Sequence, residues 1–231
     1  MSLQHREIQI PVSGGTLRLA GKLWGEGGDK RALAFPGWLD NAGSFDALAP
    51  LFVEQGWTLL CIDPPGCGLS DHRSSHETYN DYDEVPMILD VLDSMGWERC
   101  VMVAHSRGGA VAATAVGSFP SRFAAFVAFD SSLGLTGLYP TQMDTTAPQR
   151  MRLSVKSARS NRERSPRVFK TVNAAVEHSH RNTFFPKTER TARNIVRRHL
   201  TPCPGGWTFT HDVSPFTHGV SPPKNMRTCA H

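Results

Sequence analysis

VMVAHSRGGAV, residues 101–111, places a serine between an apolar run and a run of glycine and alanine. The apolar run is typical of a buried strand, and the small residues suit a closely packed helix. Small residues two positions before and after Ser106 are typical of a nucleophile elbow, a strained turn between strand and helix. Ala104 takes the place of the usual first glycine. The stretch predicts Ser106 as a nucleophile at the edge of a sheet; an ordinary strand-to-helix turn is the alternative.

Strand and helix signals alternate on both sides of this stretch. Two β-like runs around Gly14-Gly15 predict an antiparallel hairpin. Further strands are predicted at residues 32–35, 57–63, 99–105 and 123–130. Helical spacing predicts helices at residues 44–56, 83–96 and 108–119, the first of them capped by Ser44. Such alternation predicts an α/β fold with a mostly parallel sheet.

Residues that could take part in catalysis or ligand binding follow the ends of these strands. They are Pro36-Gly37, Asp63, Ser106 and Asp130. Ligands of open parallel sheets bind beyond the carboxyl ends of the strands, so a site is expected at this edge.

The chain changes character after Asp130. Residues 149–200 hold fourteen lysines and arginines but three glutamates, and their sparse apolar residues recur at helical spacing. Two or three helices packed over the sheet are expected there, with no further sheet. The basic residues are interpreted as a solvated helical face; a site for an acidic ligand is the alternative. Nucleic acid is not expected as a partner, because no aromatic residues interleave with the bases.

Composition limits the remaining options. No stretch approaches the roughly 20 apolar residues of a membrane span, and the N-terminal residues lack the pattern of a secretory signal. The five cysteines are scattered and odd in number, which favours reduced thiols in the cytoplasm over a disulfide framework. No cofactor or metal site is expected.

Three segments together carry a family resemblance: FPGWLDNAGSFDAL (35–48), DPPGCGLSDH (63–72) and AHSRGG (104–109). In this order and spacing they resemble the α/β-hydrolase superfamily, closest to its serine hydrolase-like branch. Pro36 and Cys67 stand where that branch usually has histidine. The resemblance covers about residues 5–218 and implies hydrolysis of an ester or related acyl bond of a small molecule through an acyl-serine. It implies a hydrolase core at 1–132, a basic helical cap at 133–206, and a return segment and tail at 207–231.

The resemblance also implies partners for the serine. The backbone N–H groups of Arg107 and Trp38 are the expected oxyanion donors. The side chain of Trp38 is alternatively interpreted as a core anchor, and both interpretations can hold at once. Asp130 is either the acid of the triad or a residue that caps the following loop. Asp63 is expected to serve the structure of its loop and not catalysis.

The general base has no evident candidate among the ten histidines. His178, His180 and His199 fall in helical segments and are expected to be solvated, and His105 is expected to point away from Ser106. Two more strands with their crossovers would need about 50 residues, more than follow residue 206. The last core strands and the base are therefore expected to lie outside this chain. A serine hydroxyl without a base is a poor nucleophile, so the resemblance implies a hydrolase whose activity in this 231-residue chain is left open.

Three hypotheses follow, in order of preference. The sequence represents a hydrolase cut short, a non-catalytic binding or interaction protein, or a chain whose base comes from a swapped or partner chain. In each case an unpaired apolar sheet edge invites self-association or a partner.

Overall fold

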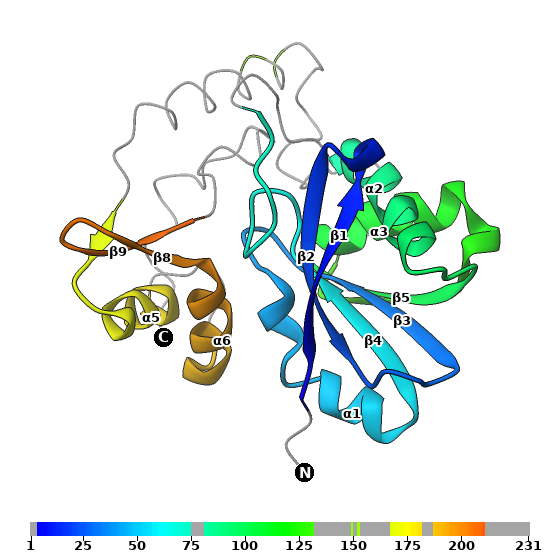
Figure 1. The fold of residues 1–231 in the computed structure, drawn as a ribbon, viewed down its shortest axis with the longest axis horizontal. Coiled ribbons are helices and arrows are strands. Elements are labelled where there is room, and N and C mark those ends of the chain that lie inside the picture. The colour runs from blue at the N-terminus through cyan, green and yellow to red at the C-terminus, as the bar shows by residue number, and fades with distance from the viewer. Residues whose placement is uncertain are drawn as a thin grey trace.

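The computed structural model describes residues 4–74, 81–131, 149, 152, 167–181 and 187–210. Its larger sheet has the strand order β1-β2-β4-β3-β5-β6 (Figure 1). The predicted hairpin and strands are confirmed: β1 (Arg6–Val12), β2 (Leu17–Trp24), β3 (Lys30–Phe35), β4 (Trp57–Ile62), β5 (Cys100–His105) and β6 (Phe123–Phe129). The strands β3 to β6 run parallel, and β2 pairs antiparallel with β1 and β4.

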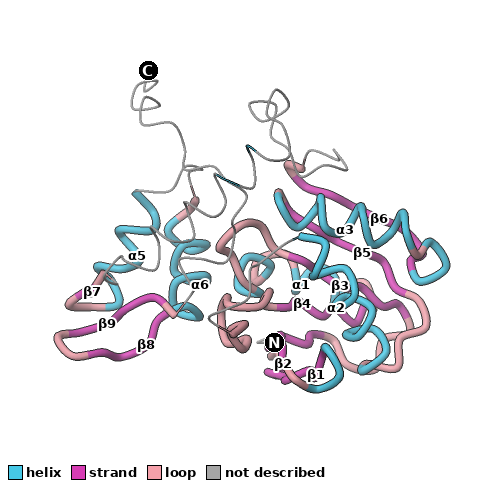
Figure 2. The backbone as a smooth tube through the Cα atoms, turned by 90° about the horizontal axis from the view of Figure 1, so that it is seen from above, coloured by secondary structure: helices cyan, strands magenta, loops and turns pink. Residues whose placement is uncertain are grey.

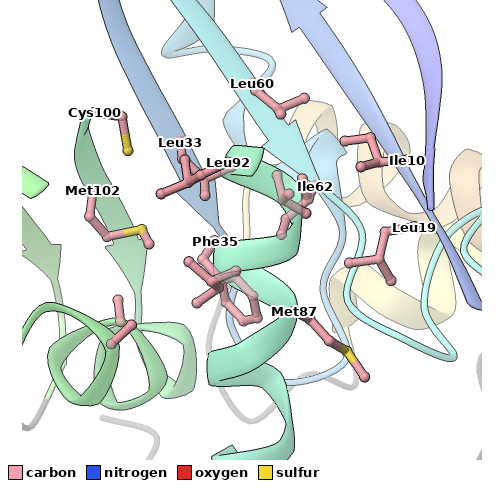
Figure 3. Packing of buried hydrophobic residues seen from close by; sticks show 14 of the residues in the cluster. Ile10, Leu19, Leu33, Phe35, Leu60, Ile62, Met87, Leu92, Cys100 and Met102 are labelled. Carbon is pink, nitrogen blue, oxygen red and sulfur yellow. The ribbon is translucent and has the colours of Figure 1, made fainter. Parts of the chain in front are cut away.

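The central strands are buried on both faces. Leu33 and Leu60 point into a cluster with Leu92 of α2 (Asp81–Ser94), as Figure 3 shows. Their neighbours Ala32 and Leu59 belong to a second cluster on the opposite face, where α1 (Ala49–Glu54) packs. Successive strand residues point to opposite faces, so continuous apolar runs are what a doubly covered sheet requires.

The predicted helix at residues 44–56 is wrong in its first half. The structure has a 3-10 turn, η2 (Ala42–Phe45), followed by the short helix α1. The side chain of Asn41 accepts the N–H of Gly43 and begins η2, so Asn41 and not Ser44 is the capping residue. Leu51 of α1 is 57% exposed, while Ala49 in the same helix is fully buried.

The described part of the chain after residue 166 folds around a separate small core. Helices α5 (Val172–Arg181) and α6 (Glu189–His199) accompany three antiparallel strands, β7 (Val168–Phe169), β8 (Leu200–Cys203) and β9 (Gly206–Phe209). The expectation of helices without further sheet is therefore wrong here. Strands of two to four residues are too short to leave a visible apolar run in the sequence.

Helix α6 makes much of the contact between this segment and the larger sheet with its loops. It lies between α5 and the sheet in both views (Figures 1 and 2) and packs against η2. Among the described helices, none is both long and apolar enough to cross a membrane.

Strand β6 is the last strand of the larger sheet within the described residues. Phe126 packs against the core, but Val127 and Phe129 are 43% and 45% exposed. Ala128 lies near Gly109 of α3 (Arg107–Ser118), so Val127 and Phe129 point to the face opposite α3. Among the residues that the structure describes, none pairs with the outer edge of β6, and Val127 and Phe129 form an exposed apolar surface there.

Candidate active site

Ser106 occupies the turn between β5 and α3. Its backbone angles, φ 51° and ψ −123°, lie in a sparsely populated region that only a well-braced turn maintains. Its N–H donates to the carbonyl of Phe129 at 3.0 Å, and its carbonyl accepts from Gly109 N–H at 2.9 Å and Ser131 Oγ at 2.8 Å. These bonds to β6 and α3 fix the strained turn on two sides.

The two glycines after Arg107 allow this turn to pack. A Cβ on Gly108 would lie 2.3 Å from the carbonyl oxygen of Pro36, and one on Gly109 would lie 2.1 Å from Ser131 Oγ. Neither position has room for a side chain. The small residues predicted around the serine are therefore required by close contact with the ends of β3 and β6.

The loop after β3 lies beside Ser106. A Cβ on Gly37 would lie 3.3 Å from the Cβ of Ser106 and 2.9 Å from Nδ1 of His105. Asp40 N–H donates to the Gly37 carbonyl at 3.2 Å and closes a turn through Trp38 and Leu39, whose φ is 57°. Trp38 is 47% exposed, so its interpretation as a core anchor is wrong. Its backbone belongs to the loop where a second oxyanion donor is expected.

Arg107 carries the other expected donor at the first position of α3. Its side chain is buried and pairs with Glu84 of α2 at 2.8 and 3.1 Å and with Asp81 at 2.6 Å. Burial would lower the pKa of Arg107, but the two carboxylates outweigh burial and raise it, so the guanidinium stays charged. The sequence did not predict the ion pairs of Arg107 with Glu84 and Asp81, which tie the first turn of α3 to α2.

Asp130 and the histidines do not complete a triad in the described residues. Asp130 directly follows β6, is exposed and has a φ of 45°. No described histidine hydrogen-bonds the hydroxyl of Ser106. His76, His211, His218 and His231 lie outside the described residues.

His199 departs from its expected solvated position. It is 2% exposed, at the end of α6, and contacts the loops after β3 and β4. The expectation failed because its ring continues the inward face of α6. Lys187 and Arg198 are further exceptions to the solvated basic face, since they pair with Asp40 at 2.6 Å and Asp63 at 2.8 Å.

Asp63 has the structural role expected of it. Its buried carboxylate accepts the N–H groups of Ala42 and Leu69 at 2.8 Å each, and both of its oxygens contact Nε of Arg198 at 2.8 Å. The loops after β3 and β4 are thereby tied to each other and to α6.

The cysteines in the described residues are free thiols: Cys61, Cys67, Cys100 and Cys203. Burial raises the pKa of Cys100 to about 12 and that of Cys61 and Cys67 further, which disfavours the reactive thiolate form of all three. No group of three or more His, Cys, Asp or Glu side chains in the described ranges is arranged to hold a metal ion.

A family model for the alpha/beta hydrolase fold matches residues 33–208. The chain belongs to this family. A serine hydrolase-like protein of Danio rerio is 29% identical over 222 residues, covering 92% of this chain and 66% of its own length. One from Dictyostelium discoideum is 28% identical over 83% of this chain and 52% of its own length. The chain thus spans between about half and two thirds of the length of these relatives.

Solved structures with the same fold are also similar to this chain. A hypothetical protein of Pseudomonas aeruginosa superposes with a TM-score of 0.79 at 30% identity, covering 93% of this chain and 72% of its own. The thioesterase domain from the curacin biosynthetic pathway superposes with a TM-score of 0.76 at 18% identity, covering 95% of this chain and 76% of its own, which supports the fold alone.

Proposed function

We propose that the chain is a serine hydrolase that cleaves an ester or related acyl bond of a small molecule through an acyl-Ser106 intermediate. The observation that carries the proposal is the strained turn at Ser106, packed against the Gly37–Trp38 loop. Strained turns of this kind cluster at functional sites, which supports a catalytic role for the Ser106 hydroxyl with the N–H groups of Trp38 and Arg107 as its oxyanion donors. Serine hydrolase-like relatives support the reaction class.

The residues have distinct roles in this reaction. Ser106 Oγ attacks the acyl carbon, and the N–H groups of Trp38 and Arg107 stabilise the oxyanion that develops. Asp130 is proposed as the acid that orients a histidine base. That histidine remains unassigned, and it would take the hydroxyl proton and return it to the leaving group. Residues 133–206 are proposed as a cap over the site and 207–231 as the return toward the core. The free thiols support a cytoplasmic location.

The test is covalent labelling of the 231-residue chain with a fluorophosphonate probe. If a histidine outside the described residues, or one from a second copy of the chain, activates Ser106, wild type gains one probe and Ser106→Ala gains none. Ser94→Ala is the matched control, because Ser94 is an exposed serine on α2 that donates to Pro11. Wild type that stays unlabelled, or Ser106→Ala that labels as fast as wild type, would contradict the proposal.

A non-catalytic interaction protein is the second candidate function, and the exposed face of β6 favours it. Val127 and Phe129 expose apolar side chains at the last described strand of the sheet. An open apolar strand of this kind is a site for association, here with a second copy of the chain.

Sedimentation velocity of the full chain tests this second candidate. Wild type is expected to dimerise with rising concentration, Val127→Lys to stay monomeric, and Leu51→Lys, at an exposed site on α1, to behave as wild type. Wild type that stays monomeric at every concentration would refute self-association. Phosphonate labelling decides separately whether Ser106 is reactive.

A further inference from the structure

Helix α6 makes several polar contacts with the loop that carries Trp38. His199 Nε2 lies 2.9 Å from the Leu39 carbonyl, and Asn41 Nδ2 donates to the Ile195 carbonyl at 2.9 Å. A Cβ on Gly43 would lie 2.7 Å from the carbonyl oxygen of Asn194, so the helix packs directly on the backbone. These residues are separated by some 150 positions in the sequence, yet they form one buried contact.

The hydrogen bonds of His199 define its tautomer. Gly68 N–H donates to Nδ1 at 3.1 Å, so Nδ1 carries no proton and the ring is neutral. The proton is then on Nε2, which donates to the Leu39 carbonyl. Both ring nitrogens are occupied by backbone groups, so His199 does not act as the general base in this arrangement.

Leu39 has a conformation that needs such support. It has a φ of 57° in the turn closed by the bond from Asp40 N–H to the Gly37 carbonyl. A residue with a Cβ is less stable in this region than in its usual conformation, because the Cβ lies too close to the following carbonyl oxygen. The hydrogen bond from His199 acts on the carbonyl of Leu39, whose peptide also carries the Asp40 N–H that closes the turn on Gly37. The Trp38 N–H lies two peptide groups earlier in the same turn.

We infer that His199 is a positioning residue, through which α6 holds the Gly37–Asp40 turn and thereby aims the Trp38 N–H at the oxyanion. The inference rests on the proposed function for its catalytic consequence. Its structural part, the bond from Nε2 to Leu39, stands whether or not the chain is a hydrolase.

Two substitutions separate the two bonds of the ring. Glutamine places its amide nitrogen near the position of Nε2, so His199→Gln keeps the donor to Leu39 and loses the acceptor for Gly68. Asparagine places its oxygen near the position of Nδ1 but is too short to reach Leu39, so His199→Asn does the reverse. Both variants lose one bond of the same ring, which makes each the control for the other.

Amide hydrogen exchange on the full chain measures the turn without any reaction. We expect the Asp40 amide to exchange on the order of tenfold faster in His199→Asn, while His199→Gln accelerates the Gly68 amide instead. The amides of β5 report global unfolding, and they should exchange alike in both variants. Unchanged protection of Asp40 in His199→Asn would overturn the inference.

Ester hydrolysis then tests the catalytic consequence. Loss of an oxyanion donor lowers kcat about 100- to 1000-fold, so a misaimed donor should lower kcat about tenfold or more in His199→Asn with KM nearly unchanged. His199→Gln should recover most of that loss. Equal losses in both variants, or a change confined to KM, would overturn the positioning role. If wild type neither hydrolyses ester nor takes the phosphonate probe, the proposed function fails and the exchange result alone decides the inference.

Discussion

Replacing Asp63 with asparagine should destabilise the chain more than any change at its exposed ion pairs. Each carboxylate oxygen of Asp63 faces a backbone N–H, that of Ala42 or that of Leu69, and also Nε of Arg198. An asparagine side chain has one oxygen and one NH2 group. Whichever way the amide turned, its NH2 group would face a backbone N–H and Nε of Arg198, which are also donors. Asp63→Asn therefore breaks a buried ion pair while it leaves the volume unchanged.

The magnitude follows from what remains around Arg198. Removal of one partner from a buried pair costs about 3–5 kcal/mol. Arg198 keeps a contact with Glu7 at 2.7 Å, but the Glu7 side chain is 47% exposed and compensates weakly. We expect a loss of about 3 kcal/mol, the lower end of that range. For a chain of this size the midpoint of thermal unfolding should fall by roughly 6–12 °C.

Urea unfolding followed by circular dichroism measures this loss. Glu7→Gln is the matched control, since it removes the exposed partner of the same arginine and should cost less than about 1 kcal/mol. The double variant Asp63→Asn, Arg198→Met removes the buried cation as well and should be more stable than Asp63→Asn alone. A loss below 1 kcal/mol for Asp63→Asn, or an equal loss for Glu7→Gln, would refute the reasoning.

Three smaller predictions concern single positions. Gly68→Ala should lower the free energy of unfolding more than Gly14→Ala, as chemical denaturation can measure. Both glycines have φ above 50°, but of the two only a Cβ on Gly68 would meet another residue, 2.2 Å from Asp63 Oδ2. The imidazole of His178 should titrate below pH 6.5 by NMR, since burial and then Arg167 lower its pKa, and Arg167→Gln should raise that midpoint. Iodoacetamide should alkylate Cys203 before the three buried thiols of the folded chain, as peptide mass mapping can follow.

The sheet and the elbow could be predicted because their signals are local. A strand buried on both faces is a continuous apolar run, and β4 and β5 both have one. The elbow needs small residues at fixed positions beside Ser106, and the close contacts of Gly108 and Gly109 explain them. In each case the physical requirement falls on neighbouring residues, so the sequence displays it directly.

Contacts between distant segments could not be predicted in the same way. Asp63 and Arg198 are 135 positions apart, and Gly68 and His199 are 131 apart. The sequence of neither segment indicates which surface the other segment covers. The helix predicted at residues 44–56 failed for a related reason, because α6 packs on η2 and the side chain of Asn41 bonds both Gly43 and Ile195.

The inward face of α6 is nevertheless visible in the sequence. The number of apolar residues in this segment is small, but their spacing is informative. Ala192, Ile195 and Val196 follow helical spacing and are buried, and the same spacing continues to His199. Read as part of that stripe, a histidine is a buried residue that needs two hydrogen-bond partners, which the backbone of two loops provides. Arg198 beside it is tolerated in the interior because a carboxylate at a strand end, Asp63, lies opposite. A polar residue that continues an apolar stripe therefore indicates that the end of the helix is buried. An acidic residue expected at the edge of the sheet then indicates which surface a neighbouring basic residue of that helix contacts.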